Sequence, residues 1–138
     1  MIVLDTNVVS EVVSGLPSSP VLPWIAAHSG VDLRITVITA MEISYGLSRL
    51  PTGRKKDQLA AAWDTVVDSW AAKFLTIDLD TSRLAGEVQG LRSRAGRPIP
   101  LADALISATT LRHGASLATR NIKDFEGLGL TLVNPWQN

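Results

Sequence analysis

Short apolar runs alternate with longer amphipathic segments along the whole chain, and this alternation is the feature that most constrains the fold. The apolar runs predict strands at 1–4, 31–36, 74–77, 115–118 and 130–133. Helical spacing and cap residues predict helices at 7–13, 20–27, 38–50, 54–72, 80–95, 101–113 and 121–125. Strands that interleave with helices favour a mostly parallel sheet covered on both faces. We therefore predict an α/β fold with three layers, α/β/α.

The chain is predicted to form one domain over 1–138. Its 138 residues are enough to bury about two thirds of the unfolded surface in one core. The stretches that contain Pro and Gly are too short for domain linkers and predict loops. No cysteine is present, which excludes disulfides, thiolate zinc sites and a cysteine nucleophile.

The charge balance limits the ways in which this chain can hold nucleic acid. Thirteen basic and thirteen acidic side chains cancel, which argues against binding through bulk positive charge, so any such contact must be local. The chain opens with a strand rather than a basic stretch, and it contains no apolar run of about 18 residues. We expect a soluble cytosolic protein with no membrane partner.

Three acidic residues are candidates for one functional site. Asp5 directly follows the first predicted strand, and Asp103 lies in the first turn of the helix predicted at 101–113. In open parallel sheets, ligand sites form at the carboxyl edge, where strands hand over to helices. Both residues belong to that edge, and Glu42 can reach it from inside its helix. Each acid alone has an ordinary explanation, as a helix cap, a first-turn acid or a solvated helix residue.

Carboxylates that gather in one pocket repel one another, so they must take up protons or share a cation. Magnesium accepts oxygen ligands at octahedral spacing and keeps several waters, so two or three carboxylates with waters and a substrate phosphate complete its shell. The three acids therefore predict a hard-metal site used for chemistry on phosphate.

Six segments stand out for their motifs: IVLDTNVVSE at 2–11, TAMEI at 39–43, GRPI at 96–99, ADALI at 102–106, LATRN at 117–121 and NPW at 134–136. Together they resemble the PIN domain and, more narrowly, the VapC and FitB toxins of type II toxin–antitoxin pairs. The resemblance spans nearly the whole chain, in the expected order.

The resemblance implies an endoribonuclease that uses Mg²⁺ or Mn²⁺ and leaves 5′-phosphate and 3′-hydroxyl ends. The family's metal-binding acids map to Asp5 and Asp103, and Glu42 is the third acid, which orients or deprotonates a water. The family often places a fourth acid after the Thr-Arg pair, where this chain has Asn121. A second metal would then depend on the amide oxygen of Asn121 or on Asp124, one helical turn further on.

Other polar residues are candidates for supporting roles. The short side chains of Thr6, Asn7 and Thr119 can fix the carboxylates or a metal-bound water, although turn or cap duties explain them equally well. Contacts to the RNA backbone are predicted for Arg92, Arg94, Arg97 and Arg120, with a solvated basic face as the alternative.

Partners follow from the same resemblance. Such toxins usually dimerise, can form larger assemblies, and are held inactive by a VapB/FitA-like antitoxin whose disordered tail blocks the acidic pocket. The antitoxin's other part binds operator DNA, so the toxin touches that DNA only through its partner. The resemblance also implies a bacterial cytoplasmic location and an RNA substrate.

Three other functions compete with the nuclease. A signalling receiver domain would use Asp78 or Asp80, but it needs a pair of acids after strand one and a lysine after strand five, which this chain lacks. A haloacid-dehalogenase-like phosphatase needs a second aspartate where Asn7 stands. The remaining alternative is a non-catalytic PIN-like module that binds RNA or a partner, which Asn121 favours and the three acids oppose.

Overall fold

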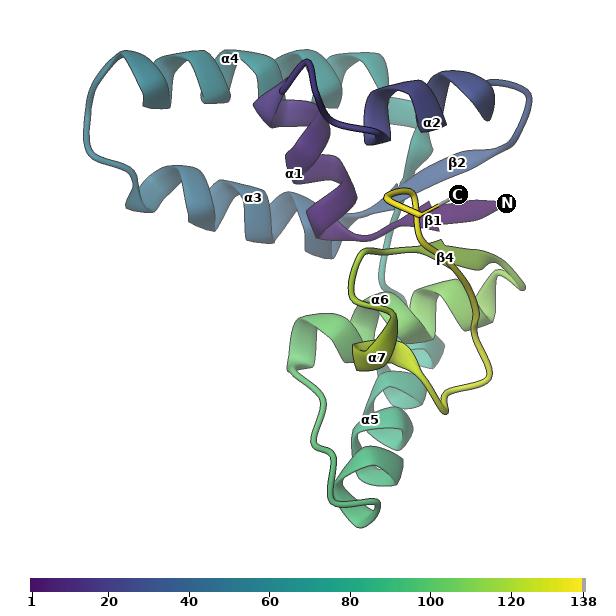
Figure 1. Ribbon diagram of the computed structural model, residues 1–138. Coiled ribbons are helices and arrows are strands. Elements are labelled where there is room, and N and C mark those ends of the chain that lie inside the picture. The colour runs from purple at the N-terminus through teal and green to yellow at the C-terminus, as the bar shows by residue number, and fades with distance from the viewer. Residues whose placement is uncertain (138) are drawn as a thin grey trace.

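The computed structural model describes residues 1–137, and these residues contain five strands and seven α-helices (Figure 1). The strands are β1 (Ile2–Leu4), β2 (Leu33–Thr36), β3 (Phe74–Leu75), β4 (Ser116–Ala118) and β5 (Thr131–Val133). The helices are α1 (Thr6–Ser14), α2 (Val21–Ala27), α3 (Val37–Arg49), α4 (Arg54–Ser69), α5 (Leu79–Arg94), α6 (Leu101–Arg112) and α7 (Ile122–Phe125). The predicted alternation of strands and helices is confirmed.

The strands form one sheet in the order β3-β2-β1-β4-β5, and every neighbouring pair is parallel. Leu4 of β1 pairs with Ile35 on one side and with Ala118 on the other. After β1 the chain proceeds to β2 and β3, and it later returns to build β4 and β5 on the opposite side. The carboxyl ends of β1 and β4 therefore flank a topological switch point, where open α/β sheets form their binding crevices.

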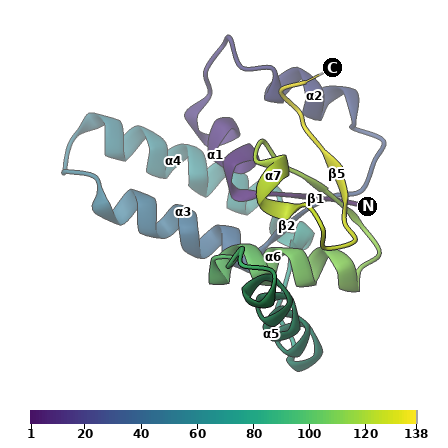
Figure 2. The ribbon, with the colours of Figure 1, turned by 60° about the horizontal axis from the view of Figure 1, so that its bottom comes forward.

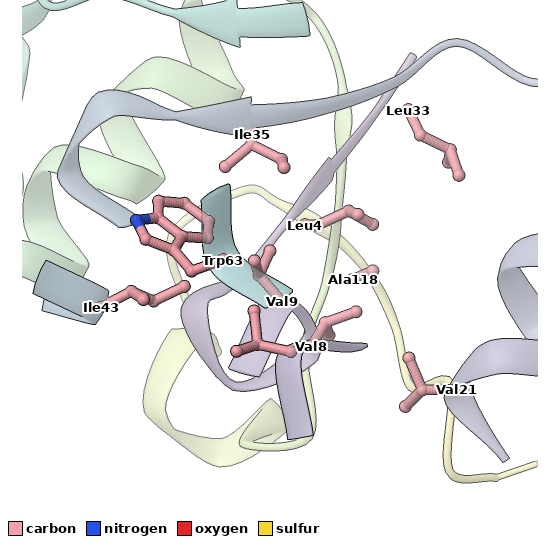
Figure 3. Packing of buried hydrophobic residues seen from close by; sticks show 10 residues of the cluster. Leu4, Val8, Val9, Val21, Leu33, Ile35, Ile43, Trp63 and Ala118 are labelled. Atoms are coloured by element: carbon pink, nitrogen blue, oxygen red, sulfur yellow. The ribbon is translucent and has the colours of Figure 1, made fainter. Parts of the chain in front are cut away.

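The two-residue period of β1 divides the core between the faces of the sheet. Leu4 belongs to a cluster with Val8, Ile35 and Trp63, which come from α1, β2 and α4 (Figure 3). Val3 belongs to a second cluster on the other face, together with Ile106 of α6 and other residues of that layer. Helices thus cover both faces, and the predicted three-layer α/β/α fold is confirmed.

Two helix pairs extend the outer layers. In both views α3 and α4 run side by side as a projecting pair, and α5 packs across α6 (Figures 1 and 2). The α5–α6 contact is made by the small or short side chains of Ala85, Val88, Ala104 and Ala108, which let the two helices approach closely. Within the described residues no helix is both long and apolar enough to cross a membrane.

The start of α5 differs from the sequence prediction. The sequence predicts a helix that starts with Asp80 as its cap, but the cap is Asp78, whose Oδ1 accepts a hydrogen bond from the backbone N–H of Thr81 at 2.8 Å. An N-cap side chain bonds the amide two or three residues ahead, and the helix begins at Leu79, so Asp80 falls in the first turn instead. The other helix and strand ends lie within a few residues of the predicted positions.

Candidate active site

Asp5 lies at the junction of β1 and α1 and is only 5% exposed. As the N-cap of α1 it accepts a hydrogen bond at Oδ1 from the backbone N–H of Thr6, at 2.8 Å. Its Oδ2 accepts a second hydrogen bond from Oγ1 of Thr119, also at 2.8 Å. Burial raises the pKa of Asp5, the Thr119 and Thr6 hydrogen bonds oppose this, and the charge of Glu42 adds to it. The two hydrogen bonds therefore hold the Asp5 carboxyl group in one orientation, and a nearby cation would stabilise its ionised form.

Glu42 is oriented by two threonines. Oγ1 of Thr6 donates to Oε1 of Glu42 at 2.6 Å, and the Oγ1 atoms of Thr6 and Thr39 lie 2.9 Å apart. Because the single Thr6 hydroxyl proton goes to Glu42, the hydroxyl of the fully buried Thr39 donates to Thr6. The chain of hydrogen bonds links α3 to the start of α1 and fixes Glu42 beside the end of β1.

Asp103 is the third acid, in the first turn of α6. Partial burial, followed by the charges of Asp5, Glu42 and Asp124, raises its pKa to about 6, and Arg92 opposes the shift. The charges of Asp5 and Glu42 both act on Asp103, so the protonation of Asp103 depends on its neighbours.

The three acids face one hollow of about 460 Å³ at the carboxyl edge of the sheet, beside the switch point between β1 and β4. Its walls come from both ends of the sequence and from the middle. They comprise Asp5, Thr6, Asn7, Ser10, Glu11, Glu42, Asp103, Arg120, Asn121 and Trp136. Four carboxyl groups therefore surround this hollow, which we call the acidic hollow.

The donor set of the acidic hollow fits a hydrated divalent cation. Among residues 1–137, no three acidic or histidine side chains stand close enough together to hold one ion directly. Mg²⁺ is ordinarily bound by one or two carboxylates and keeps the rest of its shell as water. All candidate side-chain ligands here present oxygen, and the buried, fixed Asp5 is a carboxylate whose charge lacks a basic partner in its hydrogen bonds. The residues present thus suit a hard ion that is bound in part through water.

The hydroxyl of Thr119 takes part in three hydrogen bonds that connect the walls of the hollow. Besides donating to Asp5, its Oγ1 accepts from the backbone N–H of Asn121 at 3.0 Å and from Nδ2 of Asn7 at 3.4 Å. Oδ1 of Asn7 in turn accepts from the backbone N–H of Arg120, at 3.4 Å. The predicted supporting residues Thr6, Asn7 and Thr119 therefore touch the acids or one another, and their contribution to activity stays a prediction.

The structure separates the two candidates for a fourth ligand. Asn121 lines the acidic hollow. Asp124 lines an adjoining hollow of about 490 Å³, which shares Arg120 and Asn121 with the acidic hollow. The charge of Asp124 nevertheless contributes to the raised pKa values of both Asp5 and Asp103. It acts on the acids electrostatically from the neighbouring wall.

The four candidate arginines have different environments. The prediction for Arg92 is wrong, because this side chain is buried and its Nη2 donates to the carbonyl oxygens of Asp124 and Glu126 at 2.7 and 2.9 Å. Arg97 remains exposed and donates to the carbonyl of Lys123 at 2.8 Å. Arg94 is exposed near the end of α5. Arg120 is the one of the four that lines the acidic hollow in the part of the chain described.

Sequence reasoning gave no role to Glu11 or Trp136 in this wall. Glu11 lies four residues after Asn7 on α1, a spacing that places both on the same helix face. Trp136 follows β5 closely, as Arg120 follows β4, and these strands pair in parallel with Ala118 opposite Val133. The helical spacing of Glu11 can be seen in the sequence. The position of Trp136 beside Arg120 can be predicted only when it is known that β4 and β5 are neighbours.

Comparisons with known proteins agree with this architecture. The family model described as PIN domain matches residues 2–128. A relative named VapC ribonuclease Y4jK, from Sinorhizobium fredii, is 37% identical over 138 residues, which cover 99% of each chain. The toxin FitB of Neisseria gonorrhoeae is 29% identical over 139 residues and 100% of each chain.

A solved structure has the same fold over the full length. The structure of FitAB bound to an IR36 DNA fragment contains a chain that matches with a TM-score of 0.88 and 29% identity. The match covers 100% of the present chain and 97% of that chain. The arrangement of strands and helices described above is therefore shared with a protein of known structure.

Proposed function

This chain belongs to the PIN domain family, and from that premise we propose that it is a metal-dependent endoribonuclease that serves as the toxin of a toxin–antitoxin pair. The reaction is hydrolysis of an RNA phosphodiester: the water oxygen bonds to phosphorus, the bond from phosphorus to O3′ breaks, and O3′ takes up a proton. The products carry 5′-phosphate and 3′-hydroxyl ends. The observation that carries the proposal is that Asp5, Glu42 and Asp103, from three separate elements, line one hollow.

Asp5 and Asp103 are the residues that would hold a divalent ion, Mg²⁺ or Mn²⁺. When bound, such an ion neutralises phosphate charge and lowers the pKa of a water. Asp5 is prepared for this role because its two oxygens are fixed by Thr6 and Thr119. Asp103 has a pKa of about 6, so a proton and a cation compete for it near neutral pH.

Glu42 is the proposed base. The hydroxyl of Thr6 holds Oε1, and no hydrogen bond occupies Oε2 within residues 1–137. That second oxygen can therefore accept a proton from an attacking water. Thr39 contributes indirectly, since it fixes the Thr6 hydroxyl that orients Glu42.

We propose partners by likeness to FitAB and to the named toxins. A VapB/FitA-like antitoxin would cover the acidic hollow and would alone contact operator DNA. The toxin is expected to act as a homodimer or within a larger toxin–antitoxin assembly, in the bacterial cytoplasm.

Cleavage of structured RNAs by the purified chain tests the proposal. We expect cutting with Mg²⁺ or Mn²⁺, none with chelator, and none by Asp5→Asn; the products should accept a 3′ poly(A) tail, which requires a free 3′-hydroxyl. Asp64→Asn is the matched control, because Asp64 is an exposed acid on α4 outside the walls of the hollow. Equal cutting by the parent and Asp5→Asn in chelator would overturn the mechanism.

A non-catalytic module that binds RNA or a partner is the second candidate. One observation favours it, namely that Asn121 brings no charge to the wall where the family often has an acid. If the parent binds RNA but cuts none of the RNAs tested with either ion, this second function is supported instead.

A further inference from the structure

Arg120 and Trp136 form a pair at the wall of the acidic hollow. Cζ of Arg120 lies 5.0 Å from the centroid of the Trp136 ring, and both residues line the hollow. They are 16 residues apart in the sequence but follow the neighbouring parallel strands β4 and β5. The guanidinium carbon lies over the indole ring within cation–π range. Within residues 1–137 the Arg120 side chain makes no hydrogen bond, so its N–H groups can donate to a ligand.

The positive charge of Arg120 can attract a polyanionic substrate to an otherwise acidic site. Among the described residues that line the acidic hollow, Arg120 is the one basic side chain beside four carboxyl groups. Arg120 also forms no ion pair with a carboxylate in residues 1–137. Its positive charge is therefore available to a phosphate, and no other side chain of that wall offers the same attraction.

The backbone fixes both members of the pair. The N–H of Arg120 donates to Oδ1 of Asn7, which also lines the acidic hollow, at 3.4 Å. The N–H of Trp136 donates to Oδ1 of Asn134 at 2.9 Å, which stabilises the turn after β5. Trp136 is also packed against the core that contains Leu4. The partly buried indole on this turn therefore holds the Arg120 guanidinium in a defined position.

The adjoining hollow meets the acidic hollow at Arg120 and could hold a further part of the substrate. It shares Arg120 and Asn121 with the acidic hollow, and Lys123, Asn134 and Gln137 also line it. In this adjoining hollow two basic side chains balance two acids, whereas acids prevail in the first. An extended polyanion that enters the acidic hollow is therefore repelled less on this side.

We propose that Arg120, held by Trp136, binds a phosphate next to the scissile one and leads a single RNA strand from the acidic hollow into the adjoining hollow. The placement of the scissile phosphate rests on the proposed nuclease function. Arg120 is a substrate-binding residue, and Trp136 is a positioning residue that acts through it. The N–H donors of the guanidinium are suited to the phosphates of an extended RNA strand.

RNA affinity tests the proposal in the full-length Asp5→Asn protein with Mg²⁺, where cleavage does not intervene. We would measure the fluorescence anisotropy of a labelled single-stranded RNA over a range of salt concentrations. Arg120→Ala should raise Kd about tenfold and reduce the slope of log K against log salt by about 0.7, the loss of one phosphate contact. Arg120→Lys should keep that slope and still raise Kd several-fold, because lysine keeps the charge but lacks the planar fork of N–H donors that binds a phosphate through two contacts.

Variants of Trp136 separate positioning from general structure. Trp136→Leu should raise Kd as Arg120→Lys does, Trp136→Phe should restore most of the affinity, and Trp136→Leu combined with Arg120→Lys should be no worse than either alone. The matched control is Arg49→Lys, since Arg49 lies 5.3 Å over the Tyr45 ring on α3, away from both hollows. This control should bind RNA as the parent background does.

Unchanged Kd and salt slope in Arg120→Ala, with the fold intact by circular dichroism, would overturn the proposal. A loss of binding to a partner protein with unchanged RNA affinity would also overturn it and assign the pair to a protein interface. Failure of the nuclease function gives a different result, in which the parent cuts no RNA while the Arg120 variants still weaken RNA binding. That outcome would support the Arg120 contact and reject the catalytic mechanism.

Discussion

Asp5 and Asp78 have the same local role and opposite electrostatic environments. Each follows a parallel strand and caps the next helix, α1 or α5. Burial raises the pKa of Asp5, whereas the N–H of Thr81, then the Thr81 side chain, and more weakly Arg112, lower the pKa of the exposed Asp78. Asp5 lies at the switch point between β1 and β4, while Asp78 follows the edge strand β3. The position in the sheet thus distinguishes a candidate catalytic carboxylate from a structural cap.

Of the variants that test this comparison, Asp5→Asn should cause the largest loss of RNA cleavage. Asparagine can cap α1 but removes the charge that the metal site requires, so RNA cleavage should fall by about a thousandfold, as for loss of a main charge-stabilising group. Asp78→Asn should retain the parent's rate. The measurement is the initial rate of cleavage with Mg²⁺. Similar losses in both variants would show that helix capping, rather than charge in the hollow, explains the effect.

Thr119→Val should weaken the site without removing an acid. The variant loses the hydroxyl that donates to Oδ2 of Asp5, and loss of such a supporting contact typically costs 10- to 100-fold in metal affinity or activity. Titration of activity with Mn²⁺ measures the shift. Thr65→Val is the control, because the Thr65 hydroxyl bonds only its own helix at Ala61. An unchanged Mn²⁺ requirement in Thr119→Val would argue against a supporting role.

Asp103→Asn should change how stability depends on pH in the metal-free protein. The folded chain keeps the Asp103 proton up to about pH 6, whereas an ordinary aspartate releases it near pH 3.8. Between these values the folded state binds more protons, so the free energy of unfolding of the parent falls as pH rises. Asp103→Asn should therefore melt at a higher temperature than the parent at pH 7, with little difference near pH 3.

The control for this pH effect is the acid with the opposite shift. Asp78 has a lowered pKa, so its contribution to stability is present at neutral pH and is lost as pH falls through that pKa. The measurement is the melting temperature of Asp103→Asn, Asp78→Asn and the parent at several pH values. If Asp103→Asn is less stable than the parent at pH 7, burial and the neighbouring carboxyl charges do not destabilise the ionised form of Asp103 in the folded protein.

Asp78→Ala should have the smallest effect. It removes the cap of α5 and the ion pair with Arg112, whose Nη2 lies 3.7 Å from Oδ2 of Asp78. We expect a melting temperature lower by a few degrees at pH 7 and an unchanged cleavage rate. A marked loss of activity would mean that α5 transmits its position to the site, through α6 or through the Arg92 contacts.

The sequence was sufficient to predict the order of the elements and the placement of Asp5, Glu42 and Asp103 around one hollow. Periodicity identified the strands, and parallel topology then placed the ends of β1 and β4 at one edge. Asp5 and Asp103 were predictable because each adjoins an element end at that edge. The assignment of Glu42 depended more on the resemblance to the family, because a residue inside a helix has no comparable positional signal.

What the sequence did not predict depends on tertiary contacts. Arg92 carries a charge that suggests a surface role, yet the carbonyl oxygens of the segment at 124–126 bind it in a buried position. Glu11 lies in the segment at 2–11 but received no predicted role, although it shares a helix face with Asn7 and both line the acidic hollow. The contact between Arg120 and Trp136 requires the pairing of β4 with β5, which periodicity alone does not specify.

The central claim is that the carboxylates of Asp5, Glu42 and Asp103 serve one divalent cation. Anomalous diffraction from crystals of the full chain grown with Mn²⁺ tests it most directly. We predict a manganese peak in the acidic hollow, with Asp5 and Asp103 among its direct or water-mediated ligands, and no such peak in Asp5→Asn crystals. A parent crystal with that hollow free of manganese, at a concentration that supports RNA cleavage, would contradict the account.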